Sequence, residues 1–226
     1  LRNTKAMREI NQEQSFLPIY SYAAITDSSE GLILVNIETL ADGEFRNNFL
    51  DRALTWDAGG ALTGARHVTV AGSTLYITTP AGVAVVDVSD ALQPKLLTTV
   101  ALPGARASMQ QFRYLFVTDG EGLKVIDVTT PVRARLVPGA TVPLKDARKV
   151  FVSRTYAFVA AGPEGLAIID VEKPEAPKLR RMFDGGGQIR RAGGDDRVKG
   201  LKVDFHRVVA AGVENVPAVG QGLQQH

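Results

Sequence analysis

The absence of cysteine is the first informative feature of this sequence. None of the 226 residues is cysteine. Disulfides, cysteine-ligated metal clusters and haem attachment through a CxxCH motif are therefore excluded within this chain. Histidine is scarce as well, and no two of the three histidines, His67, His206 and His226, have the spacing of a metal site. We therefore expect the chain to contain no cofactor and to bind no transition metal.

Long apolar runs and an excess of one charge are also missing. No apolar segment approaches the roughly 20 residues of a membrane helix. The net charge is +2, from 26 basic and 24 acidic residues, and no long block of lysine or arginine occurs. This argues against a membrane span and against nucleic-acid binding. Phosphate-binding loops, a Gly-x-Ser-x-Gly elbow and paired catalytic carboxylates are absent too, which favours a protein that is not an enzyme.

What the sequence does contain is a repeat. Residues 114–128 read YLFVTDGEGLKVIDV, in which two apolar runs flank the turn residues Asp-Gly-Glu-Gly. This pattern is typical of a strand, a tight turn and a second strand. Related stretches occur at 22–37, 75–88 and 159–171.

Two markers show that the repeat has a regular period. The pair Ala-Arg occurs at 65–66, 105–106 and 147–148, at intervals of 40 and 42 residues. The aspartate of the second apolar run occurs at intervals of 40 and 43 residues, as Asp87, Asp127 and Asp170. The unit that begins at residue 105 contains four strand candidates, at 107–111, 114–118, 123–128 and 135–142. Repeated four-stranded units without helical periodicity predict an all-β fold, a β-propeller of four-stranded blades.

The repeat also predicts the domain organisation. We expect an N-terminal arm at 1–17 and a propeller domain at 18–226, with units at about 19–64, 65–104, 105–146, 147–189 and a degenerate unit at 190–226. The first unit is longer, and residues 41–60 are interpreted as its fourth strand plus an insertion loop. In the last unit, 209–219 aligns with 159–169, and Asp196-Arg197 together with 201–203 takes the place of the first strand.

Closure of the ring has two possible routes. Residues 5–16 supply a strand to the last blade, or the chain is part of a larger ring whose other blades lie outside this sequence. A first residue that is not methionine and an end within a blade favour the second route, and with it a processed product or one part of a longer polypeptide.

The repeat resembles the LVIVD family of bacterial propeller repeats. The resemblance rests on the Ala-Arg pair, on the strand that ends in Asp-Gly at 119–120, and on the motifs VVDV, VIDV and IIDV before a turn that contains proline. It is good over about 65–183, fair over 19–40 and poor over 195–219. It implies an exported protein in the periplasm, at the cell surface or outside the cell, which associates with an envelope or extracellular electron-transfer assembly. Any haem would then belong to a partner protein.

Three repeated arginines, Arg66, Arg106 and Arg148, are the candidate ligand-binding residues. They precede the first strand of their units, and in propellers this strand lines the central channel. Three guanidinium groups at a channel mouth are suited to a carboxylate or phosphate ligand. The alternative, favoured because residues that define a repeat are usually structural, is that each arginine ties neighbouring blades together through a turn aspartate or a backbone carbonyl.

Other polar residues of the repeat have structural interpretations. Asp87, Asp127 and Asp170 are expected to accept backbone N–H bonds in the following turn, as Asx turns do, rather than to act as catalytic carboxylates or calcium ligands. Residues 119–122 and 27–30 lack the alternating oxygen ligands of a calcium loop and are expected to be hairpin turns. His67 is expected to be a hydrogen-bonded strand residue.

These patterns lead to one functional hypothesis and one alternative. The hypothesis is a non-enzymatic propeller module that presents a protein-binding or scaffolding surface to another protein chain or to the remainder of a longer polypeptide. Residues beyond about 190 would then be ordered only by contact with such a partner. The alternative is an enzyme or small-anion receptor that uses the channel mouth, since propellers support many activities.

Overall fold

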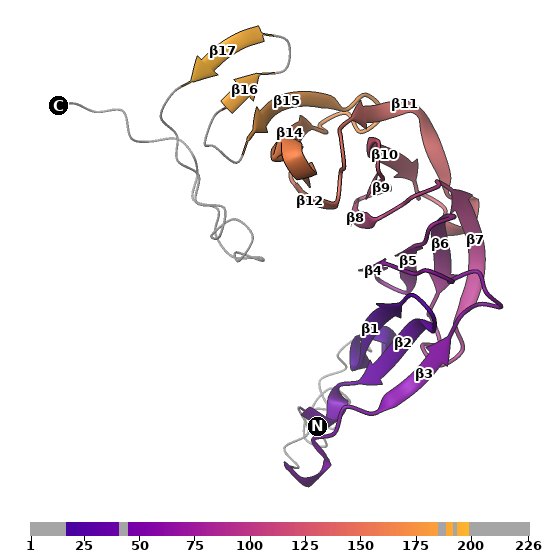
Figure 1. The fold of residues 1–226 in the computed structure, drawn as a ribbon. Helices are drawn as coiled ribbons and strands as arrows, with labels where there is room; N and C mark the ends of the chain where they lie inside the picture. Colours follow the sequence, from indigo (N-terminus) through magenta and orange to yellow (C-terminus); the bar gives the residue numbers. More distant parts are fainter. Residues whose placement is uncertain (1–16, 41–44, 185–188, 192–193, 199–226) are drawn as a thin grey trace, which may run out of the picture.

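The computed structural model of this chain describes residues 17–40, 45–184, 189–191 and 194–198, and these residues form antiparallel sheets stacked along an arc (Figure 1). We call the four sheets blades 1 to 4 in chain order. Blade 1 contains β1 (Tyr22–Asp27), β2 (Gly31–Asn36) and β3 (Arg52–Trp56). Blade 2 contains β4 (His67–Ala71), β5 (Thr74–Thr78), β6 (Gly82–Asp87) and β7 (Lys95–Ala101).

Blades 3 and 4 continue the same strand order. Blade 3 contains β8 (Ala107–Gln111), β9 (Tyr114–Thr118), β10 (Gly122–Asp127) and β11 (Arg135–Pro143). Blade 4 contains β12 (Lys149–Ser153), β13 (Tyr156–Ala160), β14 (Leu166–Asp170), β15 (Lys178–Phe183), β16 (Ile189–Arg191) and β17 (Gly194–Val198). Within each blade, every strand pairs with the next in sequence, so each blade is a simple meander.

The helices of the described residues are single 3-10 turns, one before the first strand and the others between strands. They are η1 (Pro18–Ser21), η2 (Glu38–Leu40), η3 (Phe45–Asn47), η4 (Pro131–Arg133) and η5 (Gly162–Glu164). No helix in the described part of the chain has the length and apolar character needed to cross a bilayer.

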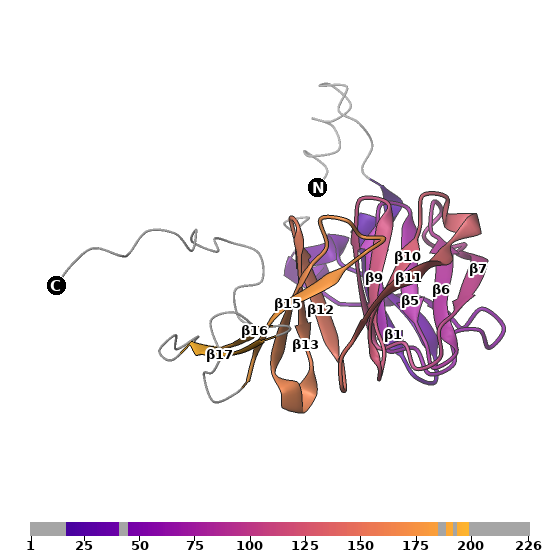
Figure 2. The same ribbon diagram turned by 90° about the horizontal axis from the view of Figure 1, so that it is seen from above.

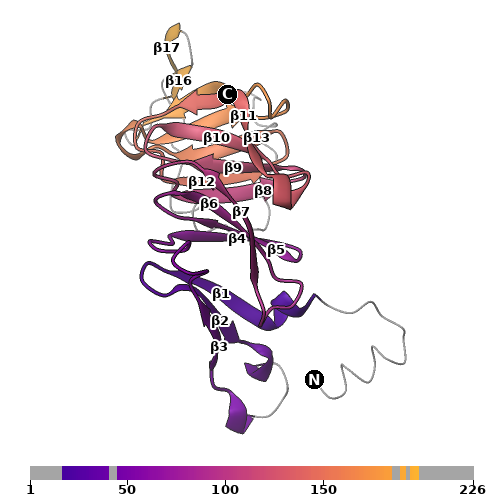
Figure 3. The same cartoon turned by 90° about the vertical axis from the view of Figure 1, so that its right-hand side faces the viewer.

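The blades pack face to face, with β4, β8 and β12 on the concave side of the arc and β7 and β11 on the convex side (Figure 1). Figure 2 shows the sheets side by side, and Figure 3 shows them stacked in chain order from blade 1 to blade 4. Each interface between blades contains its own apolar cluster. Side chains from both faces of a middle strand are therefore buried, which explains why such strands read as continuous apolar runs in the sequence.

Strand β9 illustrates this two-sided burial. All five of its residues are buried. Leu115 and Val117 pack into the cluster shared with blade 2, whereas Tyr114 and Phe116 pack into the cluster shared with blade 4. Successive side chains of a strand point to opposite faces, so one strand contributes to two cores.

A glycine at the start of the third strand lets the outer strand approach closely. A Cβ atom placed on Gly122 would lie 2.1 Å from the carbonyl oxygen of Val142 in β11. The same distance, 2.1 Å, separates a Cβ on Gly82 from the carbonyl oxygen of Val100 in β7. This close approach to a backbone atom leaves no room for a side chain at either position.

The structure confirms the predicted all-β propeller fold. In the unit from residue 105, the first two strands have the predicted bounds. The third, β10, begins and ends one residue earlier than predicted, and the fourth, β11, ends one residue later. In the first unit, β3 lies inside the long segment 41–60, as expected for a fourth strand after an insertion. Blade 1 nevertheless has three strands in the described part of the chain, because no described strand occupies its innermost position. Residues 5–16, the predicted strand donor, lie outside the described residues.

The beginning of the predicted fifth unit is placed differently. Asp196-Arg197, expected in the first strand of a new blade, belongs to β17, which pairs with β16 at the edge of blade 4. The reason is that β15, β16 and β17 follow each other after short connections, and short connections favour antiparallel hairpins over a crossover to the inner side of a new blade. Residues 201–203 and 209–219, the rest of that unit, lie outside the described residues.

Candidate functional site

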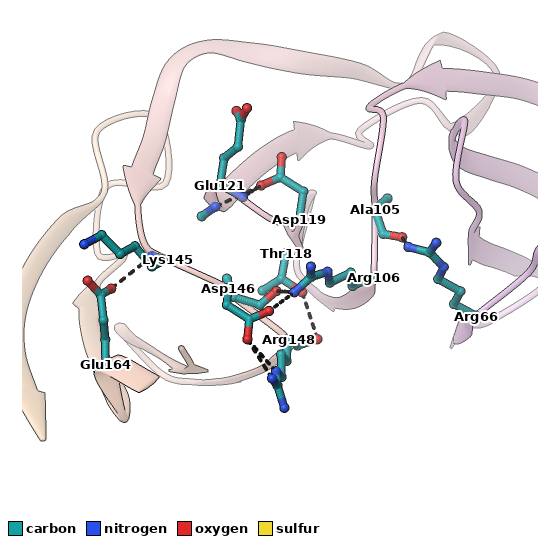
Figure 4. Close-up of polar contacts among 12 residues, drawn as sticks. Arg66, Ala105, Arg106, Thr118, Asp119, Glu121, Lys145, Asp146, Arg148 and Glu164 are labelled. Atoms are coloured by element: carbon teal, nitrogen blue, oxygen red, sulfur yellow. Dashed lines mark hydrogen bonds and ion pairs between the residues drawn. The ribbon is translucent and has the colours of Figure 1, made fainter. Parts of the chain in front are cut away.

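The three candidate arginines occupy equivalent positions in the loops that lead into blades 2, 3 and 4. Arg66, Arg106 and Arg148 each precede the innermost strand by one residue. Their backbone N–H groups donate to the last residue of the second strand, over 2.9 Å to Thr78, 2.8 Å to Thr118 and 2.8 Å to Ala160. The repeat therefore fixes the backbone. The side chains of Arg66 and Arg106 extend toward the next lead-in loop, whereas that of Arg148 turns to Asp146 in its own loop (Figure 4).

Two of the three arginines contact the following blade. Nη1 of Arg66 donates to the carbonyl oxygen of Ala105 over 3.4 Å. Nη1 of Arg106 donates to Oδ1 of Asp146 over 2.5 Å and to the carbonyl oxygen of Ala147 over 3.2 Å. These contacts are the ones expected if the arginines hold neighbouring blades together.

Asp146 is the residue on which two of the arginines converge (Figure 4). Its second carboxylate oxygen, Oδ2, accepts from Nε of Arg148 over 2.9 Å and forms an ion pair with Nη2 of Arg148 at 2.7 Å. The hydrogen bonds from Arg148 and then from Arg106 lower the pKa of the Asp146 carboxyl below its ordinary value. Arg66 lies at the preceding interface and is not part of this group.

Nothing in the sequence singled out Asp146, because the two preceding units have glycine at the equivalent position. Gly64 and Gly104 stand two residues before Arg66 and Arg106, with φ angles of 74° and 77°, and Asp146 has the same left-handed conformation, with φ at 54°. Left-handed backbone costs a residue with a Cβ atom about 1–2 kcal/mol, less for aspartate than for most. The two arginine contacts offset that cost, and the glycine at 104 explains why Arg66 has a carbonyl rather than a carboxylate as its acceptor.

Hydroxyl groups add further bonds between neighbouring blades. Thr78 Oγ1 donates to the carbonyl oxygen of Arg106 over 3.0 Å, and Thr118 Oγ1 donates to that of Arg148 over 3.2 Å. Thr69 Oγ1 donates to the carbonyl oxygen of Ser108 over 2.9 Å. On the concave side of the arc, side-chain hydroxyl groups thus form hydrogen bonds between successive blades. Binding of an anionic ligand by Arg66, Arg106 and Arg148 stays a prediction.

The repeated aspartates have the predicted turn geometry. Oδ1 of Asp87, Asp127 and Asp170 accepts the backbone N–H two residues later, over 2.8, 3.0 and 2.9 Å. These hydrogen bonds hold the pKa of each carboxyl below its ordinary value, led by the side chain of Ser89 for Asp87, the side chain of Thr129 for Asp127, and the backbone N–H of Glu172 for Asp170.

The two hairpin loops suspected of resembling calcium loops are also turns. Asp119 Oδ1 accepts from the N–H groups of Glu121 and Gly122, both over 2.8 Å, and Asp119 Oδ2 pairs with Lys124 at 2.8 Å (Figure 4 shows the turn). Asp27 Oδ1 accepts from the N–H groups of Ser29 and Glu30, over 2.7 and 2.8 Å. Each carboxylate is therefore already engaged by its own turn.

His67 is a hydrogen-bonded strand residue, as predicted. Its Nδ1 accepts the N–H of Ser108 over 3.3 Å, which requires an unprotonated Nδ1. Burial, and then the charge of Lys149, lower the pKa of His67. Among the described residues, no group of three His, Asp or Glu side chains has an arrangement suited to a metal ion.

Sequence reasoning did not find the open pocket at the opposite end of blades 3 and 4. Its volume is about 370 Å³, and it lies among the turns that contain Phe112, Arg113, Arg154 and Glu172. Phe112 has a φ of 52° and is 87% exposed. The equivalent turn residue of blade 2 is Gly72, with φ at 61°, so the only signal in the sequence was a large residue where a hairpin favours glycine or asparagine.

Blade 4 has one face that no other described blade covers, and we call it the free face of blade 4; the sequence did not indicate its extent. Tyr114 and Phe116 in blade 3 are 8% and 1% exposed, because blade 4 covers them. Tyr156 and Phe158 occupy the equivalent positions of blade 4, where Tyr156 is 43% exposed and Phe158 is half-buried. Phe151, paired with Phe158 across β12 and β13, is 44% exposed.

Comparisons with known proteins agree with the fold. The family model for the LVIVD repeat matches residues 64–101 and 145–184, which are blade 2 and the main part of blade 4 with their lead-in loops. No curated protein sequence matches this chain.

Solved structures of low sequence identity share the architecture. The β-propeller domain of Cps50 (Swd1) from Myceliophteria thermophila aligns with a TM-score of 0.54 at 14% identity, over 75% of this chain and 58% of that one. BamB from Moraxella catarrhalis aligns with a TM-score of 0.50 at 9% identity, over 79% and 57%. A nidogen/laminin complex aligns with a TM-score of 0.51 at 13% identity, over 76% of this chain and 62% of that one.

This chain therefore spans about three fifths of the length of these structures. Sequence identities this low establish the fold and not the activity. Residues 64–101 and 145–184 thus match the LVIVD repeat, and the stacked antiparallel sheets give this chain the β-propeller architecture.

Proposed function

We propose that this chain is a non-enzymatic protein-binding module, which presents the free face of blade 4 to another polypeptide. The observation that carries the proposal is the contrast between equivalent residues of blades 3 and 4. Tyr114 is 8% exposed under its neighbouring blade, whereas Tyr156 is 43% exposed. A face that repeats the chemistry of an internal interface is suited to the same kind of contact.

The physical basis is that a blade buries its apolar faces only against neighbours. In repeat proteins each unit contacts the adjacent units, and a terminal unit needs either a polar outer face or a further partner. The free face of blade 4 is not polar, since Phe151, Phe158 and Ile168 are directly paired across β12, β13 and β14. Contiguous exposed apolar surface of this kind is characteristic of interaction sites.

A photo-crosslinking experiment tests the proposal. The residue p-benzoylphenylalanine replaces Tyr156 in one variant and Leu96 in a control variant, because Leu96 is similarly exposed, at 38%, but lies on the outer strand of blade 2. Polypeptide adducts are expected from position 156 and not from position 96. The adduct must be identified by mass spectrometry, and the purified partner must bind the wild-type chain and not Phe151→Lys. Equal yields at the two positions would contradict the proposal.

A small-anion receptor or enzyme at the channel mouth is the second candidate function. The observation in its favour is that Arg66 has a single long hydrogen bond, to the carbonyl of Ala105 over 3.4 Å, which leaves guanidinium donors for a ligand. Calorimetric titration with acetate and with inorganic phosphate tests it. Saturable binding that is lost in Arg66→Gln and kept in Arg133→Gln would support it, and no heat from either anion would reject it.

The proposal extends to location and partner only through the family resemblance. We propose that the chain acts outside the cytoplasm, in the periplasm, at the cell surface or outside the cell, and that a haem protein of an electron-transfer assembly is one candidate partner. Fractionation of the source cells tests the location. A cytoplasmic chain would remove this part of the proposal and leave protein binding intact.

A further inference from the structure

The free face of blade 4 repeats a face that is covered elsewhere in the chain. Each blade presents one face to the next blade and the other to the preceding one. The face toward the next blade is formed in blade 3 by Tyr114, Phe116, Leu123 and Val125, all buried against blade 4. The same register positions of blade 4 hold Tyr156, Phe158, Leu166 and Ile168, because the pairs Phe116–Val125 and Phe158–Ile168 are equivalent.

The free face of blade 1 supplies the other half of such a blade-to-blade interface. The face that a blade turns toward its predecessor is formed in blade 4 by Ala157, Val159, Ala167 and Ile169, which are fully buried against blade 3. The equivalent positions of blade 1 hold Ala23, Ile25, Ile33 and Val35. Blade 1 has no preceding blade in the described part of the chain, and Ile25 is 46% exposed.

One chain thus carries both halves of a blade-to-blade interface, at opposite ends of the arc (Figure 1). We propose that a second copy of this chain docks its blade 1 onto the free face of blade 4. The inference rests on the proposed function, because it names the partner of that same face.

Side-chain size and charge both fit this pairing. Blade 4 offers the large residues Phe151, Tyr156 and Phe158, and blade 1 offers alanine and branched aliphatic residues, the same combination of large and small that packs blade 3 against blade 4. Ala160 replaces the hydroxyl donors Thr78 and Thr118 of the internal interfaces, so the contact is more apolar than theirs. Lys149 lies on the blade 4 face with Phe151, and Asp27 lies on the blade 1 face with Ile25, which gives opposite charges near one end of the interface.

The extent of the arc explains why a second copy is a suitable occupant. The aligned propellers are longer, since this chain spans 57–62% of them, and the two free faces do not meet within the described residues. Docking blade 1 of each copy onto blade 4 of the other uses each face once. Such head-to-tail contacts form a closed ring where the rotation closes, and here they predict a dimer with two identical interfaces.

Sedimentation equilibrium with two complementary variants tests the inference. Tyr156→Lys places a charge on the blade 4 face, and Ile25→Lys places one on the blade 1 face. Wild-type chain is expected to form dimers, and each variant alone is expected to dissociate at least ~10-fold more readily, as is typical when an interface anchor is lost. Leu96→Lys, on the outer strand of blade 2, is the control and should dimerise like the wild type.

Mixing the two variants distinguishes the proposed interface from others. A Tyr156→Lys chain keeps an intact blade 1 and an Ile25→Lys chain keeps an intact blade 4, so an equimolar mixture regains one of the two interfaces and should form heterodimers. This recovery also shows that both variants are folded. A symmetric contact between two blade 4 faces would be weakened by Tyr156→Lys alone and would not be recovered by mixing.

Two results would overturn the inference. One is a monomeric wild-type chain throughout the concentration range, and the other is a dimer that neither variant weakens. Photo-crosslinking from position 156 separates this failure from failure of the proposed function. Adducts to a different protein, with a monomeric chain, would reject the second copy and retain the protein-binding function, whereas no polypeptide adduct at all would reject both.

Discussion

Replacement of Gly122 by alanine is the sharpest test of how the blades are built. The new Cβ atom would lie 2.1 Å from the carbonyl oxygen of Val142 and 3.0 Å from the backbone nitrogen of Leu144. Both are backbone atoms of the outer strand and the loop that follows, so no side chain can move aside. The alanine must therefore push β11 away from β10 and disturb the pairing of Gly122 with Pro143 and of Leu123 with Val142.

The magnitude follows from two terms. Overpacking against a well-packed neighbour costs about 1–3 kcal/mol, and a sparsely populated backbone conformation such as the φ of 155° at Gly122 costs about 1–3 kcal/mol. We therefore expect Gly122→Ala to lower the free energy of unfolding by about 4 kcal/mol, the sum of the two mid-range values. For a chain of this size the melting temperature should fall by about 2–4 °C per kcal/mol.

Gly139→Ala is the matched control. Gly139 also lies in blade 3 and has a positive φ, 75°, but a Cβ atom there would have no heavy atom within 4 Å. It should cost only the left-handed backbone term of about 1–2 kcal/mol. Urea denaturation followed by circular dichroism measures both variants. If Gly122→Ala is no more destabilising than Gly139→Ala, then the close approach of the outer strand is not the reason for glycine at this position.

Three further predictions concern single positions. Phe112→Asn should raise the free energy of unfolding by about 1 kcal/mol, because asparagine tolerates the φ of 52° and the phenylalanine ring is 87% exposed. A free energy of unfolding that is unchanged or lower in urea denaturation would contradict this. Burial lowers the pKa of His67 in the folded chain, so as the pH falls through the ordinary histidine value of about 6.5 the unfolded chain takes up a proton before the folded chain does. The free energy of unfolding should therefore decrease as the pH is lowered through about 6.5, and a His67→Gln chain that loses as much stability would contradict the assignment. Gly104→Asp should give Arg66 a carboxylate partner like the one that Asp146 gives Arg106, so it should be less destabilising than Gly104→Ala by up to about 1 kcal/mol. Gly139→Asp and Gly139→Ala are the control pair, and an equal difference in stability between them would show that no ion pair forms at position 104.

The sequence by itself determined the strands, their order and the turns between them. Residues 114–128 predicted two paired strands because apolar runs and Asp-Gly turn residues act locally, and the structure has them as β9 and β10. Asp87, Asp127 and Asp170 were assigned to Asx turns for the same reason, since their partners are two residues away. The period near 40 residues then predicted the repeated sheets.

Only the tertiary structure decided where side chains meet across blades. The convergence of Arg106 and Arg148 on Asp146 joins residues of two blades, and Asp146 stands where the other units have glycine, so neither period nor composition marked it. The position of β17 differs from the sequence-based expectation because a strand pairs with whichever sheet edge its connection can reach. The difference in burial between Phe116, which is covered, and Phe158, which is half-buried, is likewise decided by the tertiary structure. The two residues have similar sequence environments, and the presence or absence of a neighbouring described blade sets their burial.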